Sequence, residues 1–367
     1  MDNKKIRALG ALVLAMVWVL LAGFAWLGPK EAFSTAERRP LEQFPETNGK
    51  TLLSGEFMAK FEDYTLDQFP MRDAFRQLKA LFHYNVMQQK DNNNIYVVDG
   101  YAAEMEYPLE EASVDHALSV FNQVYTRYLK DSGCKVYSVV VPDKGYYLAE
   151  DNGYLSMDYG RLFEKVAEEM PWAAQVDITG SLTLEDYYRT DTHWRQERIG
   201  AVAQKICDAM GVTTFADLAP TAMERPFYGV YYGQAALPMQ PETMYLMEND
   251  VLDGCTVTVY DNMGKKMHQP IYAPADAEAK DQYDIFLSGM EGIVHIENPN
   301  AATDRELVIF RDSFGSSLAP LLVKDYKTVT LVDLRYTQIP VLGRFVNFQN
   351  ADVLFCHSTL VLNKNLI

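Results

Sequence analysis

The sequence has few cysteines, and their spacing matches no metal site. Four cysteines occur in 367 residues, and no two of them form a Cys-x-x-Cys pair. They are Cys134, Cys207, Cys255 and Cys356, and three of the four fall in or beside predicted core elements. We interpret them first as buried free thiols. Export from the cytoplasm would also allow one or two disulfides.

Positive charge is scarce as well. Lysine and arginine total 33 against 50 aspartates and glutamates, which gives a formal net charge of −17. A nucleic-acid partner requires a basic face, so this balance argues against one. The sequence also lacks a glycine-rich phosphate loop and any Gly-x-Gly-x-x-Gly motif, which argues against a nucleotide cofactor. The acidity instead fits a soluble domain in an exposed compartment.

Histidine is the third scarce residue type. Only six histidines occur, and none has a close second histidine at the helical spacing of common zinc motifs. A metal held by Asp191 and His193 is the alternative that this pattern supports less well. We therefore predict neither a metal site nor a bound cofactor.

Long apolar runs are absent except at the amino terminus. Residues 8–28 form an uncharged apolar run, close to the roughly 20 residues that span a bilayer as a helix. Lys4, Lys5 and Arg7 precede the run, which predicts a cytoplasmic amino terminus and an extracytoplasmic remainder. We predict a signal anchor over residues 1–28 that stays in the cell membrane; a cleaved export signal that would release a secreted protein is the alternative.

The rest of the chain divides into a linker and one large domain. Residues 29–56 contain several prolines and charges and are predicted to be a linker. Residues 57–367 form the domain, in which residues 225–300 are dense in aromatics, glycine and proline and are predicted to be a β-rich insertion. Elsewhere strands alternate with helices, which indicates an α/β, three-layer sandwich with a mostly parallel sheet. The strongest predicted strands are residues 136–141, 307–310, 329–332 and 353–356.

The segment Asp191-Thr192-His193-Trp194 carries the first half of a candidate active site. In an extended segment residues two apart emerge on the same side, so Asp191 and His193 are expected to face one another. A carboxylate beside an imidazole fixes its tautomer and stabilises its protonated form. The pair is therefore predicted to be a base with its orienting residue.

A nucleophile is predicted 120 residues later. The apolar run 307–310 reads as a buried strand, and Arg311, Asp312 and Ser313 follow it directly. A serine on a strand-to-helix turn at the carboxyl edge of a sheet is the arrangement that α/β hydrolases use. Ser316 and Ser317 are the competing candidates, and both lie further into the predicted helix.

These segments also resemble a known family. Asp-Thr-His-Trp resembles the Asp-His-His-Trp signature of the DHHW proteins, relatives of the SGNH-hydrolase-like alginate O-acetyltransferases. This sequence departs from the signature at Thr192, which the alternation argument points away from Asp191 and His193. Three further stretches look similar to the family, and together with the motif they span residues 57–357, most of the chain: 61–64 with 67–73, 141–144 and 333–336.

The resemblance implies an SGNH-hydrolase-like fold and an extracytoplasmic O-acetyltransferase or esterase that acts on a cell-envelope polysaccharide. Ser313 would carry the acyl group, His193 would act as the base and Asp191 would orient it. A membrane acyltransferase would supply the acetyl groups. The residues expected to contact the substrate are Arg335, Tyr336, Lys144 and Trp194.

Two other functions stay open at this point. The tyrosine-rich insertion, residues 225–300, could form one wall of a cleft. Such a cleft would also serve a catalytically inactive module that binds a polysaccharide. The chain would also suit a structural subunit of an envelope assembly. Transfer and hydrolysis share one acyl-enzyme, so the sequence leaves the acceptor, a sugar hydroxyl or water, undecided.

Overall fold

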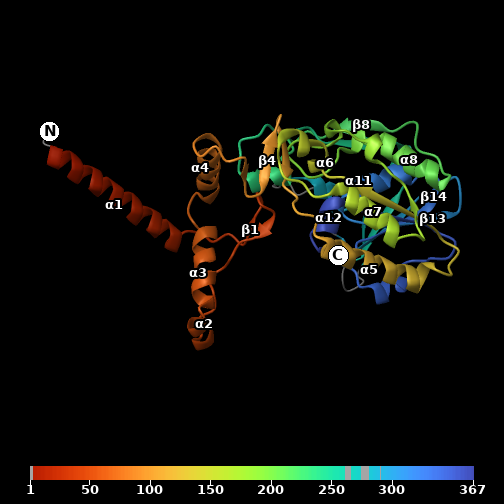
Figure 1. The fold of residues 1–367 in the computed structure, drawn as a ribbon, viewed down its shortest axis with the longest axis horizontal. Helices are drawn as coiled ribbons and strands as arrows, with labels where there is room; N and C mark the ends of the chain where they lie inside the picture. The colour runs from red at the N-terminus through yellow and green to blue at the C-terminus, as the bar shows by residue number, and fades with distance from the viewer. Residues whose placement is uncertain (1–2, 261–265, 274–280, 290) are drawn as a thin grey trace. The chain divides into compact units, whose positions relative to one another are not determined.

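The computed structural model describes residues 3–260, 266–273, 281–289 and 291–367. The chain forms two compact units (Figure 1). The first consists of Met1–Asn92 with Gly233–Pro238, and the second of Asn93–Tyr232 with Met239–Ile367.

The first unit begins with helix α1 (Asn3–Leu27), which is exposed along nearly its whole length. Its segment Lys4–Leu27 is long and apolar enough to cross a membrane. The predicted N-terminal apolar helix is therefore present.

Folded structure continues through the predicted linker. The elements after α1 are β1 (Phe33–Ser34), β2 (Arg39–Pro40), α2 (Gly49–Ser54), α3 (Glu56–Asp67), α4 (Arg72–Asn85) and β3 (Asp91–Asn92). Strands β1 and β2 pair antiparallel, and the side chain of Asn48 caps α2. Helices α3 and α4 lie on either side of Pro70.

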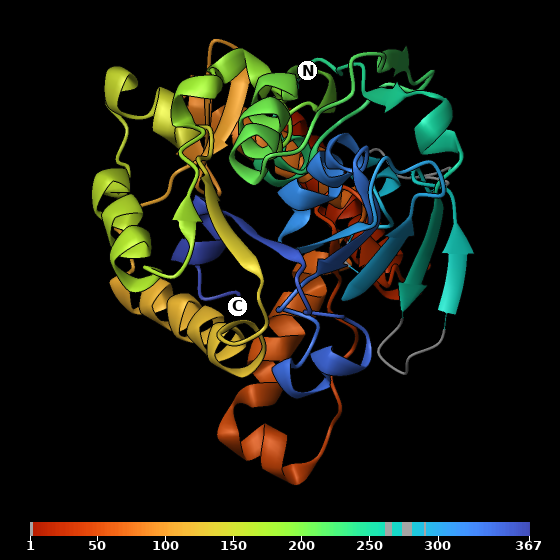
Figure 2. The same ribbon diagram turned by 90° about the vertical axis from the view of Figure 1, so that its right-hand side faces the viewer.

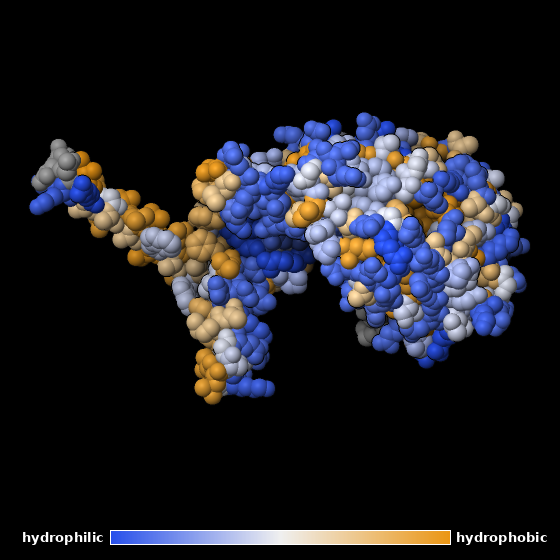
Figure 3. Space-filling model, viewed as in Figure 1, coloured by the Kyte–Doolittle hydropathy of each residue, from blue (hydrophilic) through white to orange (hydrophobic). Residues whose placement is uncertain are grey.

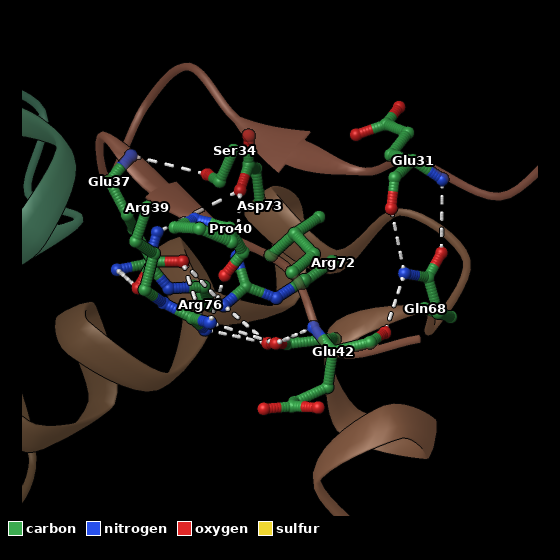
Figure 4. A network of polar contacts seen from close by, with 12 residues as sticks. Glu31, Ser34, Glu37, Arg39, Pro40, Glu42, Gln68, Arg72, Asp73 and Arg76 are labelled. Atoms are coloured by element: carbon green, nitrogen blue, oxygen red, sulfur yellow. Dashed lines mark hydrogen bonds and ion pairs between the residues drawn. The ribbon is translucent and has the colours of Figure 1, made fainter. Parts of the chain in front are cut away.

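A network of ion pairs ties this segment to α3 and α4 (Figure 4). Both carboxylate oxygens of the buried Asp67 accept hydrogen bonds from the Arg39 guanidinium, at 2.6 and 2.8 Å. Glu37 pairs with Arg72 at 2.5 Å and with Arg76 at 3.1 Å. Each carboxylate thus has charged partners that offset the loss of water around it.

The second unit is built on a twisted eight-stranded sheet (Figures 1 and 2). From one edge to the other the strands are β11 (Lys266–Gln269), β10 (Thr256–Tyr260), β12 (Ile293–Glu297), β14 (Tyr326–Val332), β13 (Arg305–Arg311), β15 (Asp352–Ser358), β6 (Lys135–Val141) and β7 (Ala174–Gln175). The five from β14 to β7 run parallel to one another. The predicted α/β fold with a mostly parallel sheet is confirmed.

Helices pack on both faces of this sheet because its central strands are apolar on both sides. Leu307 and Ile309 of β13 belong to a core cluster shared with α8 (Gly200–Met210) and α11 (Ser313–Leu322). Val308 and Phe310 point the other way, into a cluster shared with α5 (Glu111–Val124) and α7 (Tyr159–Glu169). Smaller elements of this unit are β4 (Ile95–Val98), β5 (Tyr101–Glu104), α6 (Gly145–Leu148), β8 (Ala219–Ala222), β9 (Tyr245–Glu248), α10 (Asp250–Asp253) and α12 (Thr359–Asn363).

Irregular helical turns complete this unit. Helix α5 continues into a π-helical turn, Tyr125–Leu129, and Ile339–Arg344 form a 3-10 helix between β14 and β15. Within the predicted β-rich insertion, residues 225–300, β12 pairs antiparallel with β14 and β10 pairs antiparallel with β12, so both strands extend the main sheet. All four cysteines are unpaired, as the first interpretation held.

Candidate active site

Ser313 lies at the carboxyl end of β13, as the first residue of α11. Asp312 caps the helix: one carboxylate oxygen accepts from the Phe314 N–H at 3.0 Å, and the other from the Ser358 N–H and hydroxyl at 2.7 Å. Gly315 is required for the tight turn, because a Cβ there would come within 2.5 Å of the Arg311 Cβ. These contacts hold the turn that presents Ser313.

The structure brings Ser313, His193 and Asp191 together. The Ser313 hydroxyl lies 2.7 Å from His193 Nε2, and His193 Nδ1 lies 2.5 Å from Asp191 Oδ1. In the tautomer with its proton on Nδ1, His193 donates to Asp191 and accepts from Ser313. This is the hydrogen-bonded order that an activated serine requires.

Asp191 is fully buried and held by backbone groups. Its Oδ1 also accepts from the His193 N–H at 2.9 Å, and its Oδ2 accepts from the Val230 N–H at 2.8 Å. Burial alone would raise the pKa of Asp191, but the attraction of His193 and these hydrogen bonds keep the pKa below its usual range. The carboxylate is therefore charged at neutral pH.

Because Gly229 has no side chain, the backbone of Asp191 can approach it closely. A Cβ at this position would come within 2.2 Å of the Asp191 Cβ and 2.4 Å of its Cα, too close for any rotamer to relieve. We expect Gly229→Ala to shift Asp191 or the 229–230 backbone and to lower kcat at least about tenfold, since a small misplacement is costly in a catalytic array.

The measurement is turnover of a chromogenic acetyl ester by the folded variant. Gly160→Ala is the matched control, because a Cβ at Gly160 lies no closer than 3.4 Å to its neighbours, an ordinary contact distance. Wild-type kcat in Gly229→Ala would contradict the role assigned to this close approach.

The His193 ring is fixed by aromatic and polar neighbours. Tyr283 stacks on it with ring centroids 3.7 Å apart and planes 7° apart. The Tyr283 hydroxyl lies 2.8 Å from Ser317 Oγ, which also accepts from the Trp194 indole N–H at 2.8 Å. Ser317 thus links the two aromatic residues around His193. Tyr283 was not among the residues singled out from the sequence.

The competing serines occupy other positions. Ser316 and Ser317 are both buried in α11, and the Ser317 hydroxyl is engaged by Tyr283 and Trp194. The Ser316 hydroxyl has no hydrogen-bond partner within the described ranges. Of the three serines, Ser313 is the one hydrogen-bonded to His193.

Lys144 and Trp194, expected to contact the substrate, are both buried. The Lys144 ammonium donates to the backbone carbonyls of Tyr188 at 2.8 Å and Arg189 at 3.3 Å. Burial lowers the pKa of Lys144 to about 7, against the attraction of nearby acidic groups including Asp191. In this structure Lys144 supports the loop that carries Asp191.

Arg335 and Tyr336 follow β14 at the neighbouring strand end. Arg335 Nε and Nη2 donate to Asp333 at 2.9 and 2.6 Å, and Asp333 also pairs with the buried Arg311 at 3.4 Å. Tyr336 is 42% exposed, and the Arg335 guanidinium lies over its ring at 5.4 Å. Of the four residues expected to contact the substrate, Tyr336 has the most accessible surface.

A cavity of about 440 Å³ lies beside the loop that carries Asp191 and His193, and it was not predicted from the sequence. Glu242 in its wall accepts from the Thr190 N–H and hydroxyl at 2.9 and 3.0 Å, which connects the wall to the residue before Asp191. The other lining residues are Tyr101, Glu185, Arg189, Arg195, Arg198, Thr243 and Tyr245. The signal in the sequence that could have revealed this cavity is the group of arginines on both sides of the Asp-Thr-His-Trp motif: Arg189, Arg195 and Arg198.

The arrangement supplies the parts needed for acyl transfer. Ser313 is hydrogen-bonded to a base, and the base to a buried carboxylate. As the first residue of α11, Ser313 also places its N–H among the first-turn groups that lack a partner within the helix. Such an N–H can stabilise the oxyanion of a tetrahedral intermediate.

Solved structures share this fold. A DHHW family protein from Eubacterium siraeum is 21% identical, with a TM-score of 0.60, over 75% of this chain and 94% of that chain. Bacillus cereus PatB1 with a sulfonyl adduct is 18% identical, with a TM-score of 0.58, over 74% of this chain and 96% of that chain. A further PatB1 structure has a TM-score of 0.56 at 18% identity, over 74% of this chain and 98% of that one. No protein-family model and no curated protein sequence matches the chain.

Proposed function

We propose that this chain, which has the fold of a DHHW family protein, is an extracytoplasmic serine O-acetyltransferase or esterase that carries the acetyl group on Ser313. The observation that carries the proposal is the convergence of three side chains from distant segments. Ser313 and His193 are 120 residues apart in the chain, and their side chains lie 2.7 Å apart. A structural role for this serine would not require a histidine with its own buried carboxylate.

In the first half-reaction Ser313 Oγ attacks the carbonyl carbon of an acetyl donor, and His193 Nε2 takes the hydroxyl proton. The negative charge on the carbonyl oxygen is stabilised by N–H donors that include Ser313. When the intermediate collapses, His193 returns the proton to the departing oxygen. Acetyl-Ser313 and the deacetylated donor result, and Asp191 stabilises the imidazolium formed on the way.

In the second half-reaction His193 removes a proton from an acceptor hydroxyl, whose oxygen attacks the acetyl-enzyme. Ser313 leaves and regains its proton from His193. With a sugar hydroxyl as acceptor the outcome is transfer, and with water it is hydrolysis.

The proposed acceptor is a polysaccharide of the cell envelope, and a membrane acyltransferase is proposed to supply the acetyl donor. The resemblance to alginate O-acetyltransferases supports both assignments. Helix α1 supports a place at the outer face of the cell membrane, because it is long and apolar enough to span the bilayer. We propose that Arg335 and Tyr336 contact the glycan, and that Lys144 and Trp194 position the loop that holds Asp191 and His193.

Covalent trapping of the nucleophile tests the proposal. A sulfonyl fluoride reacts with a hydroxyl that has been activated by a neighbouring base. We expect the full-length chain in detergent to form a single sulfonyl adduct, located by peptide mass spectrometry on Ser313. Pretreatment with an acetyl ester should slow the labelling, since the acetyl group occupies the same oxygen.

His193→Ala is the informative variant, because it retains Ser313 and removes the base. Labelling at the wild-type rate in His193→Ala would contradict the assignment of His193. An unlabelled wild-type protein that still binds glycan would favour the inactive binding module.

A further inference from the structure

Helix α4 in the first unit holds two arginines on its inner side and exposes an apolar stripe. Arg72 and Arg76 are only 15% and 16% exposed, and both pair with Glu37 (Figure 4). Ala80, one turn further on, is fully buried. An amphipathic helix of a water-soluble domain would show the opposite pattern, with its apolar side in the core.

The outward side carries a continuous apolar stripe. The stripe consists of Met71, Phe75, Leu78, Phe82 and Val86, which recur at spacings of three or four residues and are 43–71% exposed. In Figure 3 apolar surface appears on this part of the unit as well as along α1. A patch of this kind on a folded unit marks a surface that binds something apolar.

The start of α4 is tied to the end of the predicted membrane span. Trp26 in the last turn of α1 lies against Phe61 of α3, with ring centroids 6.2 Å apart. Gln68, just before α4, exchanges two hydrogen bonds with the Glu31 backbone at 2.9 and 3.1 Å. Met71, the first residue of the apolar stripe, is three positions after Gln68, so the stripe begins close to the end of α1.

We propose that the apolar stripe of α4 binds the outer leaflet of the lipid bilayer, with the helix lying along the membrane surface. This inference rests on the proposed anchoring of the chain through α1. Within the first unit α3 and α4 run at an angle to α1, as helices on the membrane surface would beside a spanning helix (Figure 1). An interfacial helix buries its apolar side at the boundary between headgroups and acyl chains.

The ion-pair network explains why α4 tolerates this orientation. Glu37 pairs with both Arg72 and Arg76, Asp67 also pairs with Arg72 at 3.1 Å, and Arg76 donates to the Gly233 carbonyl at 2.9 Å. The two inward-facing arginines of α4 therefore have partners within the unit. The apolar side chains are left to meet the lipid.

Spin labelling of the full-length chain in lipid vesicles tests this proposal. Single cysteines replace Leu78 or Phe82 in the stripe, or Gln77 on a different face of α4, in a Cys134→Ser background. The other three native cysteines are buried and should not react. Collisions with oxygen, which partitions into lipid, are compared with collisions with a water-soluble nickel chelate. We expect the ratio of oxygen to nickel collisions to be several-fold higher at 78 and 82 than at 77.

Equal nickel access at all three positions would place the stripe in water and overturn the proposal. Exclusion of both reagents from 78 and 82, with magnetic coupling between labels, would assign the stripe to a second copy of the chain and overturn it as well. A label on Leu14→Cys reports on the α1 span separately, and a water-exposed label there would overturn both the anchor and the stripe proposal. Acetyl ester turnover in the same vesicles reports on the catalytic proposal alone.

Discussion

Replacement of Ser313 by alanine is expected to lower acetyl ester turnover on the order of 10⁶-fold in kcat, with the residual rate supplied by the oxyanion donors and substrate binding. The variant keeps the base and the buried carboxylate but has no oxygen to form the acyl-enzyme. Neither neighbouring serine can replace it, because Ser317 Oγ is held by Tyr283 and Trp194 and Ser316 is not hydrogen-bonded to His193. The measurement is acetate or chromophore release by purified protein, with thermal unfolding recorded in parallel.

Ser316→Ala is the matched control for this loss. Ser316 lies in the same helix, is buried where Ser313 is partly exposed, and is not hydrogen-bonded to His193. We expect Ser316→Ala to keep wild-type turnover. Substantial turnover in Ser313→Ala, together with loss in Ser317→Ala, would reassign the nucleophile and contradict the proposed site.

Replacement of Asp191 by asparagine is expected to lower kcat about 10⁴-fold with little change in KM. The amide has almost the shape of the carboxylate but carries no charge to stabilise the imidazolium. It also cannot accept hydrogen bonds from both the His193 ring and the Val230 N–H, since one of its two positions is a donor. The defect therefore belongs to the chemical step, and substrate binding is preserved.

The test is a comparison of kcat and KM with those of Asp177→Asn. Asp177 is an exposed aspartate that accepts from the Thr179 N–H and hydroxyl and lies apart from the triad in sequence. We expect its asparagine variant to behave as wild type. Retention of more than about a tenth of kcat in Asp191→Asn would show that His193 does not depend on this carboxylate.

The parallel core of the fold was predictable because its sequence signals are local. Val136–Val141, Leu307–Phe310 and Val353–Cys356 are short apolar runs between turn residues, and each lies within an observed strand. Ser313 and Asp191 were predictable for a related reason. A serine after such a strand, and an aspartate two residues before a histidine, are patterns that a few adjacent residues define.

The remaining parts of the site depend on contacts between distant segments. Tyr283 stacks on His193 from 90 positions away, and Val230 contributes a backbone N–H, a group that every residue except proline carries. The burial of Lys144 was equally hidden, because a lysine after a strand is usually solvated. Apolar and polar residues alternate in β10 and β12 as in any antiparallel pair, and this alternation does not indicate which sheet the two strands join.

The distance in sequence between Ser313 and His193 has a consequence for biogenesis. A protein is made from its amino end, so Asp191 and His193 exist for 120 residues of synthesis before the nucleophile does. Strand β13, which carries Ser313 at its end, pairs with β14 and β15, and both follow it in the chain. The turn that presents the serine therefore cannot form until β15, Asp352–Ser358, has emerged, and a chain cut before residue 313 holds a base without a nucleophile.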